Sequence, residues 1–171
     1  MSTRASSIRI DVKLQETGEM LALLQRISGT GPVDVMAARL MVEPYAATAA
    51  ALNATGADLA AIREAHGLAS AETDPMGFER LDAEFHTRIF AATRNELLLC
   101  LNDILRVVRN QSSWIEIKRR SYSEPRRRQY CDEHELIIQA LFSRNGDGAA
   151  QAMKNHLLTV NRNLFGDGQA Y

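Results

Sequence analysis

The fold of this chain is decided by residues 74–90, Asp74-Pro75-Met76-Gly77-Phe78-Glu79-Arg80-Leu81-Asp82-Ala83-Glu84-Phe85-His86-Thr87-Arg88-Ile89-Phe90. Aspartate followed by proline is a typical helix start, because the carboxylate accepts hydrogen bonds from free backbone N–H groups and proline fits the first helical position. Apolar residues then recur every three or four positions, at Phe78, Leu81, Phe85 and Ile89. This is the period of an amphipathic helix, so the stretch predicts a helix with one face in a protein core.

The rest of the chain has the same character. Only four prolines and ten glycines interrupt it, and we find no convincing strand. We therefore predict an all-α fold, an antiparallel bundle of six or seven helices. The predicted helices span residues 14–27, 34–53, 56–66, 75 to beyond 90, 95–117, 125–142 and 147–164. Pro44 is expected to kink or break the second helix, and Gly67 to end the third.

Composition and charge argue against several classes of function. The chain has 171 residues, with 20 Lys and Arg against 21 Asp and Glu and a net charge of −1, so no overall field attracts nucleic acid or a lipid surface. No apolar run reaches the length of a membrane span, and the N-terminus lacks the pattern of a secretory signal. We expect one domain in the cytoplasm, with no membrane partner and with Cys100 and Cys131 as reduced thiols.

Polar side chains on the apolar faces carry the chemical information. On a helical wheel, Asp82 and His86 fall inside the apolar arc of their helix. His134 lies between Ile137, Ile138 and Leu141, and His156 is flanked by Ala149, Met153 and Val160 in the last helix. Three separate helices therefore direct an imidazole inward, one of them with a carboxylate one turn away.

A buried carboxylate needs a partner, because its desolvation costs several kcal/mol. One aspartate and three neutral imidazoles suit a divalent transition metal such as Zn²⁺, Ni²⁺, Fe²⁺ or Mn²⁺. The alternative is that each histidine is a hydrogen-bonded core residue, which is the usual role of a single inward histidine. His66 is interpreted as a cation at the helix end before Gly67 and is assigned no ligand role.

At these residues the sequence resembles the FadR C-terminal (FCD) effector domain of GntR-type bacterial transcription regulators. The resemblance spans about residues 34–160. It rests on Asp82-x-x-Phe85-His86-x-x-Ile89, Ala92-x-x-Asn95-x-x-Leu98, Glu133-His134-x-x-Ile137, Gly146-Asp147-x-x-Ala150-x-x-Met153-x-x-His156-Leu157, and on Ala38-Arg39-Leu40-Met41-Val42-Glu43-Pro44 upstream.

The resemblance implies a helical bundle with a central cavity, a divalent metal held by Asp82, His86, His134 and His156, and a small organic acid bound near that metal. It also implies a homodimer that passes the effector signal to a winged helix-turn-helix. We expect zinc in a purified sample, with nickel, iron or manganese as alternatives.

Arg39 is the predicted effector anchor, because it shares an arc with small residues and its guanidinium can bind a carboxylate at two points. The alternative for Arg39 is an i, i+4 pair with Glu43. Tyr130, one turn before His134, is a second pocket candidate; the alternative is an ordinary core tyrosine.

The chain departs from the family at its N-terminus, where residues 1–33 are too short for a winged helix-turn-helix. We therefore divide it into a lead-in with a short helix (1–33), an FCD-like metal- and effector-binding domain (34–165) and a tail (166–171). DNA would be contacted only through a domain absent from this chain.

Three functions follow: a metal-containing sensor of an organic acid, which we favour; a stand-alone metalloenzyme acting on a small organic acid; and a helical interaction domain without metal. We expect no enzymatic activity, because no inward acid is placed as a general base. The basic runs Lys118-Arg119-Arg120 and Arg126-Arg127-Arg128 are interpreted as a solvated helix end, with a phosphate-binding patch as the alternative.

Overall fold

The computed structural model describes residues 14–166, and the predicted polar lead-in before residue 14 and the tail after residue 166 lie outside this range. The described residues form eight helices and no strand, so the all-α prediction is confirmed. The helices are α1 (Leu14–Ser28), α2 (Pro32–Asn53), α3 (Gly56–Ala71), α4 (Pro75–Ala92), α5 (Glu96–Arg109), α6 (Ser112–Ser121), α7 (Glu124–Phe142) and α8 (Gly146–Phe165).

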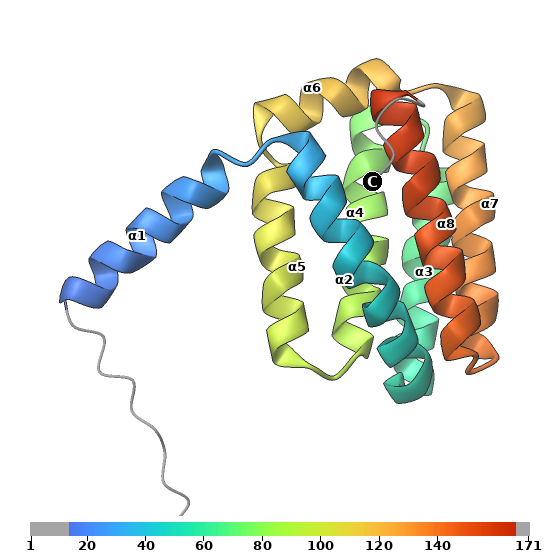
Figure 1. Cartoon of the computed structure of the whole chain (residues 1–171). Helices are drawn as coiled ribbons and strands as arrows, with labels where there is room; N and C mark the ends of the chain where they lie inside the picture. Colours follow the sequence, from blue (N-terminus) through green and yellow to red (C-terminus); the bar gives the residue numbers. More distant parts are fainter. Residues whose placement is uncertain (1–13, 167–171) are drawn as a thin grey trace, which may run out of the picture.

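Six of the helices, α2 to α5, α7 and α8, run up and down as a bundle, while α6 crosses one end of it and α1 projects away (Figure 1). Helix α2 packs most extensively against α8. Helix α2 also carries four fully buried alanines, and such small side chains let neighbouring helix backbones approach closely. These alanines are Ala46, Ala47, Ala50 and Ala51.

Several helices begin where the sequence offers a capping side chain. Asp74 accepts a hydrogen bond from the Gly77 N–H at 2.7 Å, and Pro75 follows at the first helical position of α4. Asn145 does the same for the Gly148 N–H of α8 at 2.9 Å. These caps satisfy backbone donors that the helix itself leaves free, and so they set the start of two of the three helices that carry inward histidines, α4 and α8.

Two predicted helix boundaries are wrong. The predicted helix 95–117 is broken after Arg109, so residues 14–166 form eight helices where the sequence predicted six or seven. Asn110 and the two serines that follow favour a helix end and a new helix start over a helix interior. The break turns α6 across the end of the bundle.

Helix α3 continues through Gly67 to Ala71, because burial of Ala69 on the same helix offsets the modest cost of an exposed glycine. His66 therefore lies more than one turn before the end of α3, and its interpretation as a helix-end cation is wrong. Pro44 likewise does not break α2, which is continuous from residue 32 to residue 53.

None of the helices within residues 14–166 combines the length and the apolarity required to cross a membrane.

Candidate metal centre

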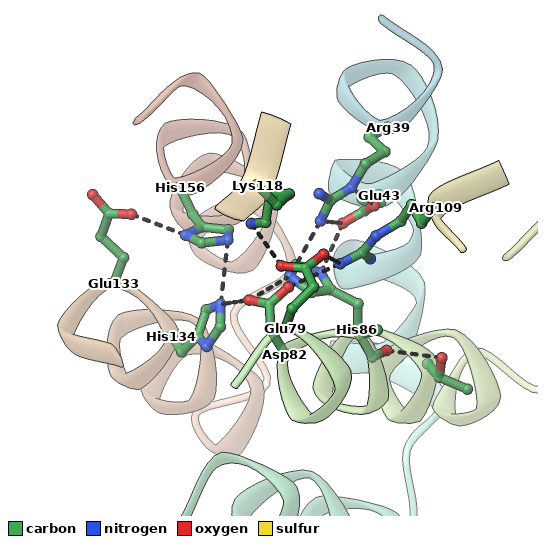
Figure 2. Close-up of polar contacts among 12 residues, drawn as sticks. Arg39, Glu43, Glu79, Asp82, His86, Arg109, Lys118, Glu133, His134 and His156 are labelled. Carbon is green, nitrogen blue, oxygen red and sulfur yellow. Dashed lines mark hydrogen bonds and ion pairs between the residues drawn. The ribbon is translucent and has the colours of Figure 1, made fainter. Parts of the chain in front are cut away.

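Four polar side chains meet at the centre of the bundle. Asp82 and His86 come from α4, His134 from α7 and His156 from α8 (Figure 2). One carboxylate oxygen and one nitrogen of each imidazole all lie within 4.8 Å of one another. All four residues are at most 2% exposed. The helical pattern therefore placed the four candidates on the correct faces, and the packing of three helices brings them to one point.

The ligand atoms that face one another are the Nε2 atoms of the three imidazoles. His134 Nε2 lies 3.2 Å from His156 Nε2 and 3.5 Å from Asp82 Oδ1. His86 Nε2 lies 3.9 Å from the same Asp82 oxygen. Three nitrogens and one oxygen around a shared point form a donor set that suits zinc and related divalent metals.

Two of the imidazoles are held from behind by carboxylates. His86 Nδ1 lies 2.7 Å from Glu43 Oε2, and His156 Nδ1 lies 2.9 Å from Glu133 Oε2. A neutral imidazole that donates its Nδ1 proton to a carboxylate keeps a lone pair on Nε2. Glu133 therefore aims the lone pair of His156 at the shared point, which is the state that binds a metal. Glu43 lies against His86 Nδ1 without the angle of a hydrogen bond.

Burial controls the charge of the imidazoles. Because they are shielded from water, the pKa values of His134 and His156 lie well below the ordinary value, and neighbouring imidazoles lower them further. Both rings are thus neutral near pH 7, as metal ligands must be.

Arg39 extends from α2 into the same centre. Its Nε and Nη2 atoms donate to the two oxygens of Glu43 at 2.5 and 3.3 Å, and Nη2 also lies 3.3 Å from His86 Nε2. The i, i+4 pair with Glu43 is present, and the same guanidinium also points at the cluster. Although burial alone would raise the pKa of Glu43, Arg39 and His86 hold it well below its usual range.

The negative charge of Asp82 is compensated by cations on the side away from the imidazoles. Arg109 Nη2 donates to Asp82 Oδ2 and to Glu79 Oε1, both at 3.0 Å. Lys118 Nζ lies 2.8 Å from Glu79 Oε2, and the Trp114 indole donates to Glu79 Oε1 at 3.0 Å. Burial would raise the pKa of Asp82, but His86, Lys118, His134 and Arg109 outweigh it and keep Asp82 charged.

Tyr130 lies beside this centre and not within it. Its ring centroid is 5.6 Å from that of His156, and its hydroxyl accepts a hydrogen bond from Asn163 at 3.0 Å. Tyr130, Glu79 and Lys118 are among the residues that line a cavity of about 20 Å³, which is room for about one water molecule. The structure therefore places Tyr130 at the edge of the centre, mostly buried.

Sequence reasoning considered Glu43 only as a partner of Arg39, and it missed the supporting role of Glu79, Arg109, Lys118 and Glu133. Two of them carried a usable signal, because Glu79 lies one turn before Asp82 and Glu43 one turn after Arg39 on the same helix faces. Lys118 was assigned to a solvated helix end, but it is only 9% exposed and is paired with Glu79, and Arg127 is likewise buried against Glu124. Lys118 and Arg127 are therefore buried in ion pairs and do not belong to a solvated helix end.

Comparison with known proteins identifies the family. A model of the FCD domain family matches residues 34–159, which confirms the resemblance drawn from the motifs. The chain is 30% identical over 139 residues to the "Uxu operon transcriptional regulator" of Escherichia coli K12 and 32% identical over 141 residues to the "Putative L-lactate dehydrogenase operon regulatory protein" of the same strain. These matches cover 79% and 80% of this chain but 54% of each relative, so the chain spans about half the length of the curated relatives it matches.

A solved structure shares the fold. "Streptococcus agalactiae GntR" superposes with a TM-score of 0.62 at 22% identity, covering 91% of this chain and 68% of that one. At this identity the likeness concerns the arrangement of helices.

The lowered pKa values predict how the metal-free protein responds to acid. The unfolded chain protonates its histidines near the ordinary pKa of 6.5, while folded His134 and His156 remain neutral. Below that pH the unfolded state therefore binds more protons, and the free energy of unfolding should fall as the pH falls, by up to about 1.4 kcal/mol per pH unit for each imidazole.

Urea unfolding in the presence of a chelator between pH 7.5 and pH 5.5 measures this dependence. The variant His156→Gln should show a shallower slope than the parent protein. A free energy of unfolding that stays constant over this range would contradict the burial of neutral imidazoles.

Proposed function

The chain belongs to the FCD domain family, and from this premise we propose that it is the effector-sensing domain of a GntR/FadR-type transcriptional regulator that binds a divalent transition metal and a small carboxylate ligand. The observation that carries the proposal is the convergence of three imidazole nitrogens and one carboxylate in a buried centre. We assign sensing to residues 34–165, with residues 1–33 as lead-in and residues 166–171 as tail.

Asp82, His86, His134 and His156 would hold the metal. Their donor set leaves coordination positions for water or an added ligand, and the bound ion supplies a Lewis-acidic point that attracts a carboxylate or hydroxyl oxygen. We expect zinc in a purified sample, because its affinity for nitrogen ligands is high, while nickel, iron or manganese could occupy the site where the cell supplies them.

The charges around the centre support an anionic ligand. Three buried or nearly buried cations, Arg39, Arg109 and Lys118, face three such carboxylates, Glu43, Glu79 and Asp82. Their formal charges cancel, and Glu133 behind His156 adds one more negative charge. A divalent ion would therefore leave an excess of one positive charge in a poorly solvated space, and a ligand carboxylate would compensate it.

Arg39 is suited to couple the metal to the ligand. One edge of its guanidinium is occupied by Glu43, while Nη2 also donates to the lone pair of His86 Nε2. A metal on His86 would take that lone pair, and the outer edge of Arg39 would then be left for a ligand carboxylate. Ligand binding should therefore depend on the metal.

The enzyme alternative receives no support from two of the carboxylates near the centre, Glu43 and Glu79. Glu43 is paired with Arg39 and His86, and Glu79 with Arg109 and Lys118. Both have pKa values below the usual range even though burial opposes this, which makes them weak proton acceptors. The relatives in hand are named as transcriptional regulators, so we assign sensing without turnover.

We propose that two copies form a homodimer in the cytoplasm and that contact with DNA is made through a winged helix-turn-helix domain. The outward face of α5 is the candidate contact surface. It has a strongly apolar stripe of exposed side chains next to the projecting helix α1, and such stripes commonly mark protein contacts. The stripe consists of Leu97, Leu101, Ile104 and Val107.

Metal content tests the first part of the proposal. Protein purified without a chelator and without an immobilised-metal column should contain about one divalent metal per chain, and the variant His134→Ala should contain almost none. Elemental analysis provides the measurement, with Arg88→Ala, at an exposed position, as the control. A content below about 0.2 metal per chain in the parent protein would remove the metal site.

The ligand is tested with a panel of small mono- and dicarboxylates. Thermal shift and calorimetry should detect a binder only with metal bound, and the ligand should be recovered unchanged. The variant Arg39→Lys keeps the charge beside Glu43 but loses the two-point contact, so it should retain metal and bind the carboxylate at least about tenfold more weakly. Equal affinity of both proteins would rule out Arg39 as the anchor.

The dimer is tested by light scattering after size-exclusion chromatography. The double variant Leu97→Asp, Ile104→Asp should be monomeric at concentrations where the parent protein is dimeric. Leu136→Asp, at an exposed position on α7, is the matched control and should stay dimeric. A dimer that survives the double variant would place the contact elsewhere.

A further inference from the structure

A cavity of about 510 Å³ lies where α4, α5 and α6 meet, and none of the four candidate metal ligands lines it. Its walls include the apolar side chains of Met76, Leu81 and Ile115. Apolar walls with a few convergent charges are the usual lining of a small-molecule site, and the volume is in the range of such sites. The charged residues of the lining are Glu79, Arg80, Glu84, Arg106 and Arg109.

Arg109 joins this cavity to the candidate metal centre. Its Nη2 atom donates to Glu79 and to Asp82, both at 3.0 Å (Figure 2). Its Nε atom, in contrast, is buried and has no hydrogen-bond partner within residues 14–166, and the whole residue is only 6% exposed. A buried donor without an acceptor costs free energy. An acceptor that enters the cavity beside this guanidinium would remove that cost.

The two carboxylates of the lining are neutralised by cations that do not belong to it. Glu84 lies 2.6 Å from Arg88 Nε, and Glu79 lies 2.8 Å from Lys118 Nζ. Neither Arg88 nor Lys118 lines the cavity. The negative charge inside the cavity is therefore already offset from behind.

The other two arginines of the lining keep positive charge to spare. Arg80 is exposed and forms no ion pair in the described part of the chain. Arg106 is paired with Asp103 at 3.5 Å, and both side chains are exposed, so this pair is weak. The cavity therefore presents two poorly compensated guanidinium groups next to the unpartnered Nε of Arg109.

We propose that this cavity binds a phosphate monoester that has an apolar body. The phosphate is held by Arg80, Arg106 and Arg109, and the Nε–H of Arg109 gains the acceptor that it lacks. The body lies against Leu81 and Ile115. A dianion matches the two poorly compensated charges, and clustered guanidinium groups bind phosphate oxygens through strong, charge-assisted hydrogen bonds.

The position of Arg109 also couples the cavity to the metal centre, and this part of the inference rests on the proposed function. A metal on Asp82 neutralises the carboxylate that engages Arg109, so the guanidinium can direct more of its charge to the phosphate. A phosphate that draws on Arg109 in turn leaves Asp82 a stronger metal ligand. Metal and phosphate should therefore strengthen one another, by the same factor in both directions.

The first experiment titrates phenyl phosphate into metal-free protein, kept in a chelator, and follows binding by calorimetry. Inorganic phosphate tests the contribution of the apolar body, and phenylacetate tests the need for a dianion. We expect phenyl phosphate to bind and both comparison compounds to bind at least about tenfold more weakly. No binding of phenyl phosphate overturns the proposal, and equal binding of either comparison compound overturns the ligand class.

A double variant locates the binding site. Arg80→Gln, Arg106→Gln should bind phenyl phosphate at least about tenfold more weakly than the parent protein, because two charge-assisted hydrogen bonds are lost. The matched control Arg63→Gln, Arg128→Gln removes two exposed positive charges outside the cavity and should bind as the parent does. Equal affinity of the parent and of the first double variant places the ligand elsewhere and overturns the proposal.

The Nε–H signal of Arg109 reports the contact at the floor of the cavity. In a ¹H–¹⁵N spectrum assigned through the side-chain carbons, phenyl phosphate should move this proton signal downfield, since the donor gains a charged acceptor. Inorganic phosphate at the same concentration is the control for bulk effects. A signal that does not move during saturation by phenyl phosphate excludes Arg109 from the site.

The coupling is tested by repeating the titration with zinc-loaded protein. We expect the affinity for phenyl phosphate to rise at least about fivefold. An unchanged affinity overturns the coupling, and so does an equal rise in Arg80→Gln, Arg106→Gln, because the probe would then bind the metal itself. Failure of the parent protein to bind any divalent metal would instead refute the proposed function, and the metal-free titration would still decide whether the cavity binds the phosphate.

Discussion

A carboxylate in the middle of a helical bundle is stable only when nearby charges replace the water it has lost, and the structure is organised around this requirement at Asp82. The compensation comes from several helices. Arg109 at the end of α5 contacts Asp82 directly, and the imidazoles of His86 on α4 and His134 on α7 lie near its other oxygen. The same contacts that tie these helices together thus create a site with the geometry of a metal centre. Fold and candidate function depend on one set of side chains.

Burial destabilises the charged carboxylates around the centre, and each of them is offset by more than one partner. Glu79 does not contact the imidazole nitrogens, but it pairs with Arg109 and Lys118 and receives the indole proton of Trp114. Glu43 does the equivalent on the side of α2, between Arg39 and His86. Each carboxylate near the centre is therefore shared between at least two partners. Removing any one cation would leave a buried negative charge undercompensated, which is costly.

Sequence patterns predicted the parts of this site that depend on one helix at a time. The inward direction of Asp82, His86, His134 and His156 follows from helical periodicity alone. The supporting residues depend on how helices meet, which periodicity does not describe. Lys118 reaches the centre only because the chain breaks after α5, and Glu133 reaches His156 only because α7 lies against α8. The broken helix was the error with the largest effect, because a continuous helix over residues 95–117 would not carry Lys118 across the end of the bundle.

The break between α5 and α6 also gives the molecule a built-in optical probe. Trp114 is the sole tryptophan in the chain. Its indole is 1% exposed, donates its proton to Glu79 and lies 5.6 Å from the guanidinium carbon of Arg109. Any rearrangement of the charges around Asp82 alters the field at this ring, so its ultraviolet emission should change in intensity and wavelength when the centre is filled or emptied. Occupancy can therefore be followed in the unlabelled protein by fluorescence.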